Sequence, residues 1–110
     1  MAINKELLKG STVIMILTML SEQEMYGYEI IKEMERKSNG VFIFKEGTLY
    51  PILHGLETED WVTSYWQTHD SRKRKYYRIT KSGQALLQEK VKEWNLFRNA
   101  VDGVLGEGHA

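Results

Sequence analysis

The spacing of apolar residues changes twice along this chain, and these changes constrain the fold more than any other feature of the sequence. Up to about residue 59, apolar side chains recur at helical intervals, as Leu49, Ile52, Leu53 and Leu56 do. Between residues 61 and 79 they alternate, which is typical of two paired strands. After residue 80 the helical interval returns. The sequence therefore predicts a mainly α-helical fold with one small β-hairpin.

The boundaries of these segments define the expected architecture. We predict helices over about residues 4–20, 26–37, 46–59 and 81–105, and strands over about residues 61–67 and 74–79 joined by a polar tip at 68–73. Thr80 is a suitable cap for the last helix, whose end is expected to fray at Gly103, Gly106 and Gly108. This order is that of a winged helix-turn-helix with an added C-terminal helix. We expect residues 1–80 to form the winged, DNA-binding module and residues 81–110 to form a dimerisation helix with a frayed tail.

Length and composition indicate one globular domain. The chain has 110 residues, of which 42% are hydrophobic and 27% are charged, so it can bury one modest core. It contains no cysteine, which excludes disulfides and thiolate metal sites. The first residues show no signal-peptide pattern, and the apolar run Val13–Leu20 is far shorter than the ~20 residues that cross a membrane. We therefore expect a cytoplasmic protein without membrane association.

Positive charge is concentrated in one place although the formal net charge is zero. Between Asp70 and Lys81, one acidic residue stands among six basic ones: Arg72, Lys73, Arg74, Lys75, Arg78 and Lys81. Phosphate is attracted by such local patches rather than by the total charge of a protein. The pattern favours a polyanionic partner.

The third predicted helix has an outer face that suits the major groove of duplex DNA. When its apolar positions face the core, the opposite face is formed by Gly47, Pro51, His54 and Thr58. The centre of this face carries no charged side chain, and its small and hydrogen-bonding groups permit close approach to base edges. The alternative is an ordinary surface on which Tyr50 packs against a neighbour. DNA contacts are expected from this helix and from the start of the preceding one: Tyr26, Gly47, Thr48, Tyr50, Pro51 and His54.

The predicted hairpin carries the positive cluster at its tip. The four adjacent cations Arg72–Lys75 would repel one another in a protein that met no polyanion. Alternation places Tyr77 and Ile79 inward and Tyr76 outward, where a tyrosine among arginines suits the sugar–phosphate backbone. We therefore expect these four cations and Tyr76 to contact DNA. The alternative is a solvated charge run without a partner.

The last predicted helix carries a seam for a second copy of the chain. Its apolar residues follow a coiled-coil spacing, with Arg98 at the intervening seam position: Leu87, Val91, Trp94, Val101 and Leu105. The first helix is apolar around most of its circumference, so it is expected to be buried on more than one side. We expect both helices to form a homodimer interface, which would present two reader helices to a pseudo-palindromic DNA site.

A seam tryptophan near a dimer axis faces its own copy, which suggests a site for a small planar aromatic ligand stacked between two indoles. Such a ligand would change the spacing of the reader helices and so modulate DNA affinity. The alternative is that Trp94 only packs in the interface. The expected lining combines both helices: Leu7, Gly10, Val13, Ile14, Val91, Trp94 and Arg98.

Four segments combine into one recognisable pattern: Gly27–Ile31, Glu46–Leu53 with Leu56–Glu57, Ser64–Trp66 and Arg74–Gly83. This combination resembles the PadR family of bacterial transcriptional regulators over about residues 5–105. The resemblance implies a DNA-binding repressor of the short subfamily with one C-terminal helix, similar to members that bind multiple drugs. In those members a tryptophan at the place of Trp94 stacks on planar drugs. Val13 and Arg98 depart from their pattern, which has an asparagine and an acid, and Arg98 disfavours a cationic ligand.

Together these features favour a sequence-specific DNA-binding repressor that acts as a homodimer and is released by a small planar effector. The alternative is a winged-helix module that only assembles proteins, without an effector, and the cationic tip counts against it. An enzyme is not expected, because His54, His69 and His109 are too scattered for a metal site and the sequence has no phosphate-binding loop. We also expect no cofactor and no bound metal.

Overall fold

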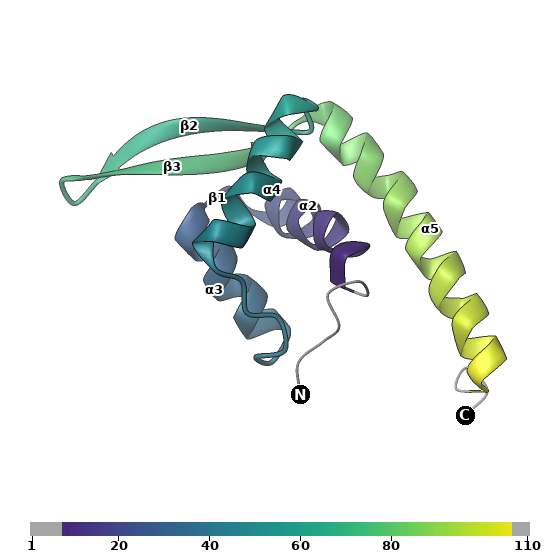
Figure 1. Cartoon of the computed structure of the whole chain (residues 1–110). Helices are drawn as coiled ribbons and strands as arrows, with labels where there is room; N and C mark the ends of the chain where they lie inside the picture. Colours follow the sequence, from purple (N-terminus) through teal and green to yellow (C-terminus); the bar gives the residue numbers. More distant parts are fainter. Residues whose placement is uncertain (1–7, 107–110) are drawn as a thin grey trace.

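Three helices and the base of a hairpin surround one core in the computed structural model, which describes residues 8–106. The elements follow one another as α2 (Thr12–Glu22), β1 (Met25–Tyr26), α3 (Gly27–Lys37), α4 (Glu46–Thr58), β2 (Val62–His69), β3 (Arg72–Ile79) and α5 (Lys81–Leu105). In Figure 1 the β2–β3 hairpin projects to one side of the molecule and α5 descends on the other. The predicted mainly helical fold with a hairpin and a C-terminal helix is confirmed.

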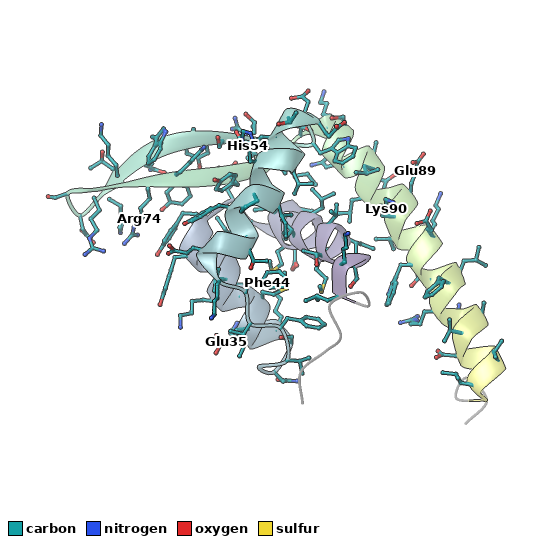
Figure 2. All side chains as sticks on the ribbon, in the orientation of Figure 1. Glu35, Phe44, His54, Arg74, Glu89 and Lys90 are labelled. Atoms are coloured by element: carbon teal, nitrogen blue, oxygen red, sulfur yellow. The ribbon has the colours of Figure 1, made fainter. Side chains whose placement is uncertain are left out.

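The core lies where α2, α3, α4 and the hairpin meet. Ile16 and Leu17 of α2, Ile30 of α3 and Leu53 of α4 are completely buried. Phe44, from the connection between α3 and α4, is also buried and is labelled near the middle of the molecule in Figure 2. The predicted inner face of α4 is confirmed, because its buried residues are three of the four expected ones: Leu49, Leu53 and Leu56.

Helix α2 begins and ends later than predicted. The chain makes a turn at Gly10 and Ser11, so the prediction of one unbroken helix over residues 4–20 is wrong. The carbonyl of Leu8 accepts hydrogen bonds from the hydroxyls of Ser11 at 3.1 Å and Thr12 at 2.9 Å. The same kind of bond occurs inside the continuous helices α2 and α4, whereas glycine has a low helix propensity and so favours a break at Gly10. Residues 4–7 of the prediction lie outside the described residues.

The sheet has three strands, although only the two of the hairpin were predicted. Strand β3 lies in the middle, with β2 on one side and the short β1 on the other. In β1, Met25 pairs with Tyr77 and Tyr26 pairs with Tyr76. A strand of two residues is too short to show an alternating pattern, so the sequence could not indicate it.

The hairpin turn is tighter than predicted. Strand β2 continues to His69 and β3 starts at Arg72, so the expected polar tip at residues 68–73 is wrong. The turn consists of Asp70 and Ser71, whose φ angles are 50° and 64°. Positive φ at both central residues is the conformation that a two-residue hairpin turn needs to match the twist of its strands. Arg72 and Lys73 therefore belong to a paired strand, with their side chains exposed.

The start of α5 is fastened to the corner between α4 and β2. Thr80 caps the helix as predicted, since its Oγ1 accepts a hydrogen bond from the Gly83 N–H at 3.0 Å. The hydroxyls of Thr80 and Ser82 donate to the Asp60 carbonyl at 2.7 and 2.8 Å. A Cβ atom at Gly83 would overlap the Trp61 carbonyl oxygen. Helix and corner therefore approach as closely as their backbones allow.

Beyond its first turns, α5 extends away from the body of the molecule (Figure 1). Leu86 and Leu87 are partly buried against the core, whereas the residues from 91 to 101 are all exposed. Gly103 is helical, so its predicted fraying is wrong, and the helix ends at Gly106 with a left-handed φ of 83°. Gly108 lies outside the described residues. Neither α5 nor another helix within residues 8–106 has the length and hydropathy to cross a membrane.

Gly83→Ala should destabilise the fold by about 2–3 kcal/mol, because backbone at the α4–β2 corner cannot yield to the new methyl group. The measurement is the free energy of unfolding in urea. Gly103→Ala is the matched control in the same helix, since a Cβ atom there meets nothing within 4 Å. Alanine at this second position should be neutral or slightly stabilising. Equal stability of both variants would contradict the close approach at Gly83.

Candidate nucleic-acid interface

The outer face of α4 is exposed and carries no charge at its centre. Gly47, Thr48, Pro51 and His54 all lie on this exposed side, opposite the buried leucines. Pro51 occurs inside the helix and has no N–H group, so the Gly47 carbonyl lacks its usual helical donor. Gly47 is exposed, which leaves that carbonyl open to water or another donor. The face therefore offers small groups, a hydroxyl, an imidazole and backbone atoms to a partner.

Tyr50 lies between this face and the neighbouring helix. Its side chain is 41% exposed, and a Cβ atom built on Gly27 would be 2.6 Å from its Cε1 and Oη atoms. Glycine at the start of α3 thus lets the tyrosine ring rest against that helix. Burial raises the pKa of the Tyr50 phenol, and the charge of Glu46 adds to this effect. Tyr50 therefore fits both expectations in part. Its ring packs against α3, and 41% of its surface remains exposed to a partner.

Three tyrosines gather on the outer face of the sheet, and we call Tyr26, Tyr65 and Tyr76 the tyrosine cluster. The rings of Tyr65 and Tyr76 are stacked with centroids 5.6 Å apart, and Tyr26 meets Tyr76 edge-on at 5.5 Å. The Arg74 guanidinium lies over the Tyr26 ring, 4.5 Å from its centroid. Tyr76 is therefore half-buried in a cluster and less free than expected for an outward tyrosine. The Tyr26 ring therefore orients the Arg74 guanidinium.

An acidic residue beyond the sheet holds the tyrosine cluster in place. The Tyr65 hydroxyl donates a hydrogen bond to the Glu24 carboxylate, and this bond raises the pKa of Tyr65. The Arg78 guanidinium lies 4.0 Å from the same carboxylate and 5.6 Å from the centre of the Tyr65 ring. Sequence reasoning missed Tyr65 and Glu24, which are far apart in the chain. Only the strand register, which places Tyr65 opposite Tyr76, could have indicated one of them.

On the other face of the sheet, Glu57 joins α4 to the hairpin. Its Oε2 accepts a hydrogen bond from the Ser64 hydroxyl at 2.6 Å, and its Oε1 lies 3.6 Å from the Lys75 ammonium. Tyr77, between them and the core, is buried as predicted, and burial raises the pKa of its phenol. Lys75 is thus ion-paired. Among the four adjacent cations, Arg72 and Lys73 are exposed, whereas Arg74 and Lys75 are half-buried.

A groove of about 970 Å³ runs between α4, the start of α3 and the hairpin. Its lining includes seven of the residues predicted to contact DNA: Tyr26, Tyr50, His54, Arg72, Lys73, Arg74 and Lys75. Gly47, Thr48, Pro51 and Tyr76 lie outside its lining. The lining also includes Glu46, Glu57 and Trp66, which were not predicted as contacts. Figure 2 labels His54 on α4 and Arg74 on the hairpin, the two elements that form the walls. Four cations against two carboxylates give the groove a positive balance.

The predicted ligand residues lie mainly between α2 and α5. Two cavities of about 460 and 640 Å³ open there, and Trp94 and Ile14 line both. Val91 lines the first of these cavities, and Gly10 and Val13 line the second. Arg98 is exposed and lines neither, and Leu7 lies outside the described residues.

The exposed apolar surface of α5 is larger than the predicted dimer seam. Val91, Trp94, Val101 and Leu105 are exposed, and Leu87 is partly buried. Three further apolar residues, which the seam pattern did not include, are also exposed: Leu96, Phe97 and Val104. Within residues 8–106, histidines, aspartates and glutamates form no group of three that could hold a metal ion.

Known regulators match most of this chain. The family model described as "Transcriptional regulator PadR-like family" matches residues 16–89. Transcriptional regulator Rv3488 of Mycobacterium tuberculosis is 33% identical to this chain over 85 residues, which are 77% of either protein. The solved structure of a transcriptional regulator from Clostridium thermocellum has a TM-score of 0.83 and 32% identity over 90% of this chain and 97% of that one. A PadR family transcriptional regulator from Eggerthella lenta has a TM-score of 0.80 and 32% identity, covering 91% and 86%.

Proposed function

This chain belongs to the PadR-like family of transcriptional regulators, and we propose that it is a repressor that binds a pseudo-palindromic operator as a homodimer. We also propose that a small planar aromatic effector releases it from DNA. The observation that carries the first proposal is the positively charged groove beside the uncharged outer face of α4. A repressor of this kind would act in the cytoplasm.

In the proposed complex, α4 enters the major groove and the hairpin follows the adjacent backbone. Gly47, Thr48 and Pro51 are small enough to let the helix approach base edges, and His54 supplies a hydrogen-bonding side chain. The groove between α4 and the hairpin then receives one sugar–phosphate strand, which meets Arg72–Lys75. Tyr26 orients Arg74 toward that strand, and Tyr76 supports Tyr26 from behind. Reading of sequence and attraction of phosphate are thus assigned to different elements.

Removing the two exposed cations at the hairpin end, Arg72 and Lys73, should weaken binding to every DNA sequence. If each subunit neutralises about four phosphates, the logarithm of affinity should fall with the logarithm of salt concentration with a slope near −7 for the dimer. Arg72→Ala combined with Lys73→Ala removes four cations per dimer and should bring this slope to about −4. The measurement is a gel shift on the DNA upstream of the gene at several salt concentrations.

Lys92→Ala is the control, because it removes an exposed cation from α5 without touching the groove. It should leave the slope unchanged. A wild-type slope shallower than about −2 would exclude the hairpin from the interface. If the double variant binds its partner as tightly as the wild type does, the result would instead favour a module that assembles proteins.

The dimer proposal rests on the exposed apolar surface of α5. Val91 and Trp94 expose 38% and 42% of their surfaces, and Leu105 exposes 67%. Burying a fully exposed side chain of this size contributes about 1.5–3 kcal/mol, and each seam residue would supply a part of that, because it is already partly buried in the subunit. Helix α2 would pack beside the seam, and residues 81–110 would act as the dimerisation part next to the winged module of residues 1–80. Two-fold symmetry then requires an operator with two related half-sites.

Val101→Glu should convert the dimer into a monomer, because it places a charge in the seam. Sedimentation equilibrium measures the mass, and operator affinity should fall by about 100-fold when two half-sites are no longer held together. Asn99→Glu adds the same charge to an exposed position outside the seam and should preserve both properties. A wild-type protein that binds its operator as a monomer would contradict the dimer.

The effector proposal rests on the two cavities beside Trp94. Their volumes, about 460 and 640 Å³, lie within the range of known small-molecule sites. Trp94 offers a flat ring to both, and Ile14 and Val13 offer apolar walls from the α2 side. A planar ligand held there would change the contact between α2 and α5. It would thereby change the distance between the two reader helices in the dimer.

A neutral planar probe such as acridone should quench the fluorescence of Trp94 and lower operator affinity by about tenfold or more. Trp94→Ala should abolish both effects, whereas Asn99→Ala, at an exposed position that lines neither cavity, should retain them. The measurements are a fluorescence titration and a gel shift with and without the probe. The effector proposal fails if the probe lowers the operator affinity of Trp94→Ala as much as that of the wild type, or if Trp94→Ala changes dimer stability and nothing else.

A further inference from the structure

Trp66 is an exposed apolar residue in an otherwise polar and positively charged part of the hairpin. It exposes 65% of its surface, and among the large apolar side chains of β2 and β3 it is the exposed one. Exposing an indole to water is unfavourable, because its ring is one of the largest apolar surfaces a side chain can offer. Its position places an apolar surface beside the cations that line the groove.

The strand register shows which face of the sheet Trp66 occupies. Trp66 pairs with Lys75, and Ser64 pairs with Tyr77. Residues two apart in a strand share a face, so Trp66 lies on the face where Tyr77 is buried and Ser64 bonds to Glu57 of α4. Trp66 lies two residues further along β2, away from the core. At this point α4 still reaches the sheet through the Glu57–Lys75 ion pair, but the Trp66 ring is exposed.

The surroundings of Trp66 are those of the groove between α4 and the hairpin. The groove that it lines is also lined by Lys73 and Lys75 of the facing strand and by His54 of α4. Tyr65 and Tyr76 are on the opposite face of the sheet, Tyr26 lines another part of the groove, and among the described residues the Trp66 ring has no aromatic partner. Its indole is therefore free to meet the same molecule that the cations attract.

We propose that Trp66 packs its indole against a deoxyribose of the DNA strand in this groove and supplies an affinity term that does not depend on charge. This inference rests on the proposed DNA-binding function and deepens it. A deoxyribose is the apolar part of the DNA backbone, and it lies between the phosphates that Lys73 and Lys75 approach. The indole N–H can donate to a phosphate oxygen while the ring covers the sugar. The cations then draw the strand into the groove, and Trp66 excludes water from it.

Trp66→Ala should lower operator affinity by about tenfold at all salt concentrations. The salt slope should stay at its wild-type value, since an indole that covers a sugar displaces no counterion. Calorimetry should show a less negative heat-capacity change on binding, because less apolar surface is buried. Trp66→Phe should lose only part of the affinity. An exposed residue contributes little to the fold, so the melting temperature should change little.

Gln67→Ala is the matched control. Gln67 is the next residue of β2, is also exposed, and pairs with Arg74 on the opposite face of the sheet. It should bind DNA as the wild type does. If the wild type binds the operator and Trp66→Ala binds equally well, or loses affinity through a shallower salt slope, this inference is wrong and the proposed function stands. If the wild-type protein retains no duplex at any salt concentration, the proposed function falls and this inference with it.

Discussion

Burial of the leucine face of α4 determines most of what this molecule can present to a partner. Leu49, Leu53 and Leu56 enter the common core, and each contributes about 1.5–3 kcal/mol relative to an exposed position. Their burial fixes the rotation of the helix about its own axis. The uncharged outer face is then turned outward, and Glu57 comes to the side of the helix where it meets Ser64 and Lys75. One apolar contact thus orients both the reading surface and the hairpin beside it.

The two parts of the interface differ in chemistry because they serve different purposes in the proposed complex. The outer face of α4 has little charge and cannot hold DNA by itself, but it can discriminate between base edges. The hairpin has the charge, and its internal contacts reduce how much of it is free. Arg74 rests on a tyrosine ring and Lys75 is paired with Glu57, so two of four adjacent cations are held in defined positions. A hairpin with four mobile cations would bind any polyanion more readily and would select its register less well.

The parts of the fold that the sequence predicts are those that depend on local periodicity. The bounds of α3, α4 and α5, the buried face of α4 and the cap at Thr80 all follow from spacing within a few residues. The missed features depend on contacts between residues far apart in the chain. The bond from Tyr65 to Glu24 spans 41 positions, and β1 exists only because β3 pairs with it. The break before α2 falls at Gly10 and Ser11, inside a continuous helical pattern of apolar residues that does not reveal it.

The close seating of α5 on the α4–β2 corner makes this helix a lever. Its 25 residues form a rod of about 37 Å, because each helical residue adds about 1.5 Å. Gly83 and the Asp60 carbonyl give the rod a stiff pivot at the end nearest the hairpin. A tilt of about 5° at that pivot moves the far end by about 3 Å. A slight wedge near the fulcrum would therefore be magnified along the rod, and a modest shift at the distal tip would return to the corner as a small, well-defined rotation.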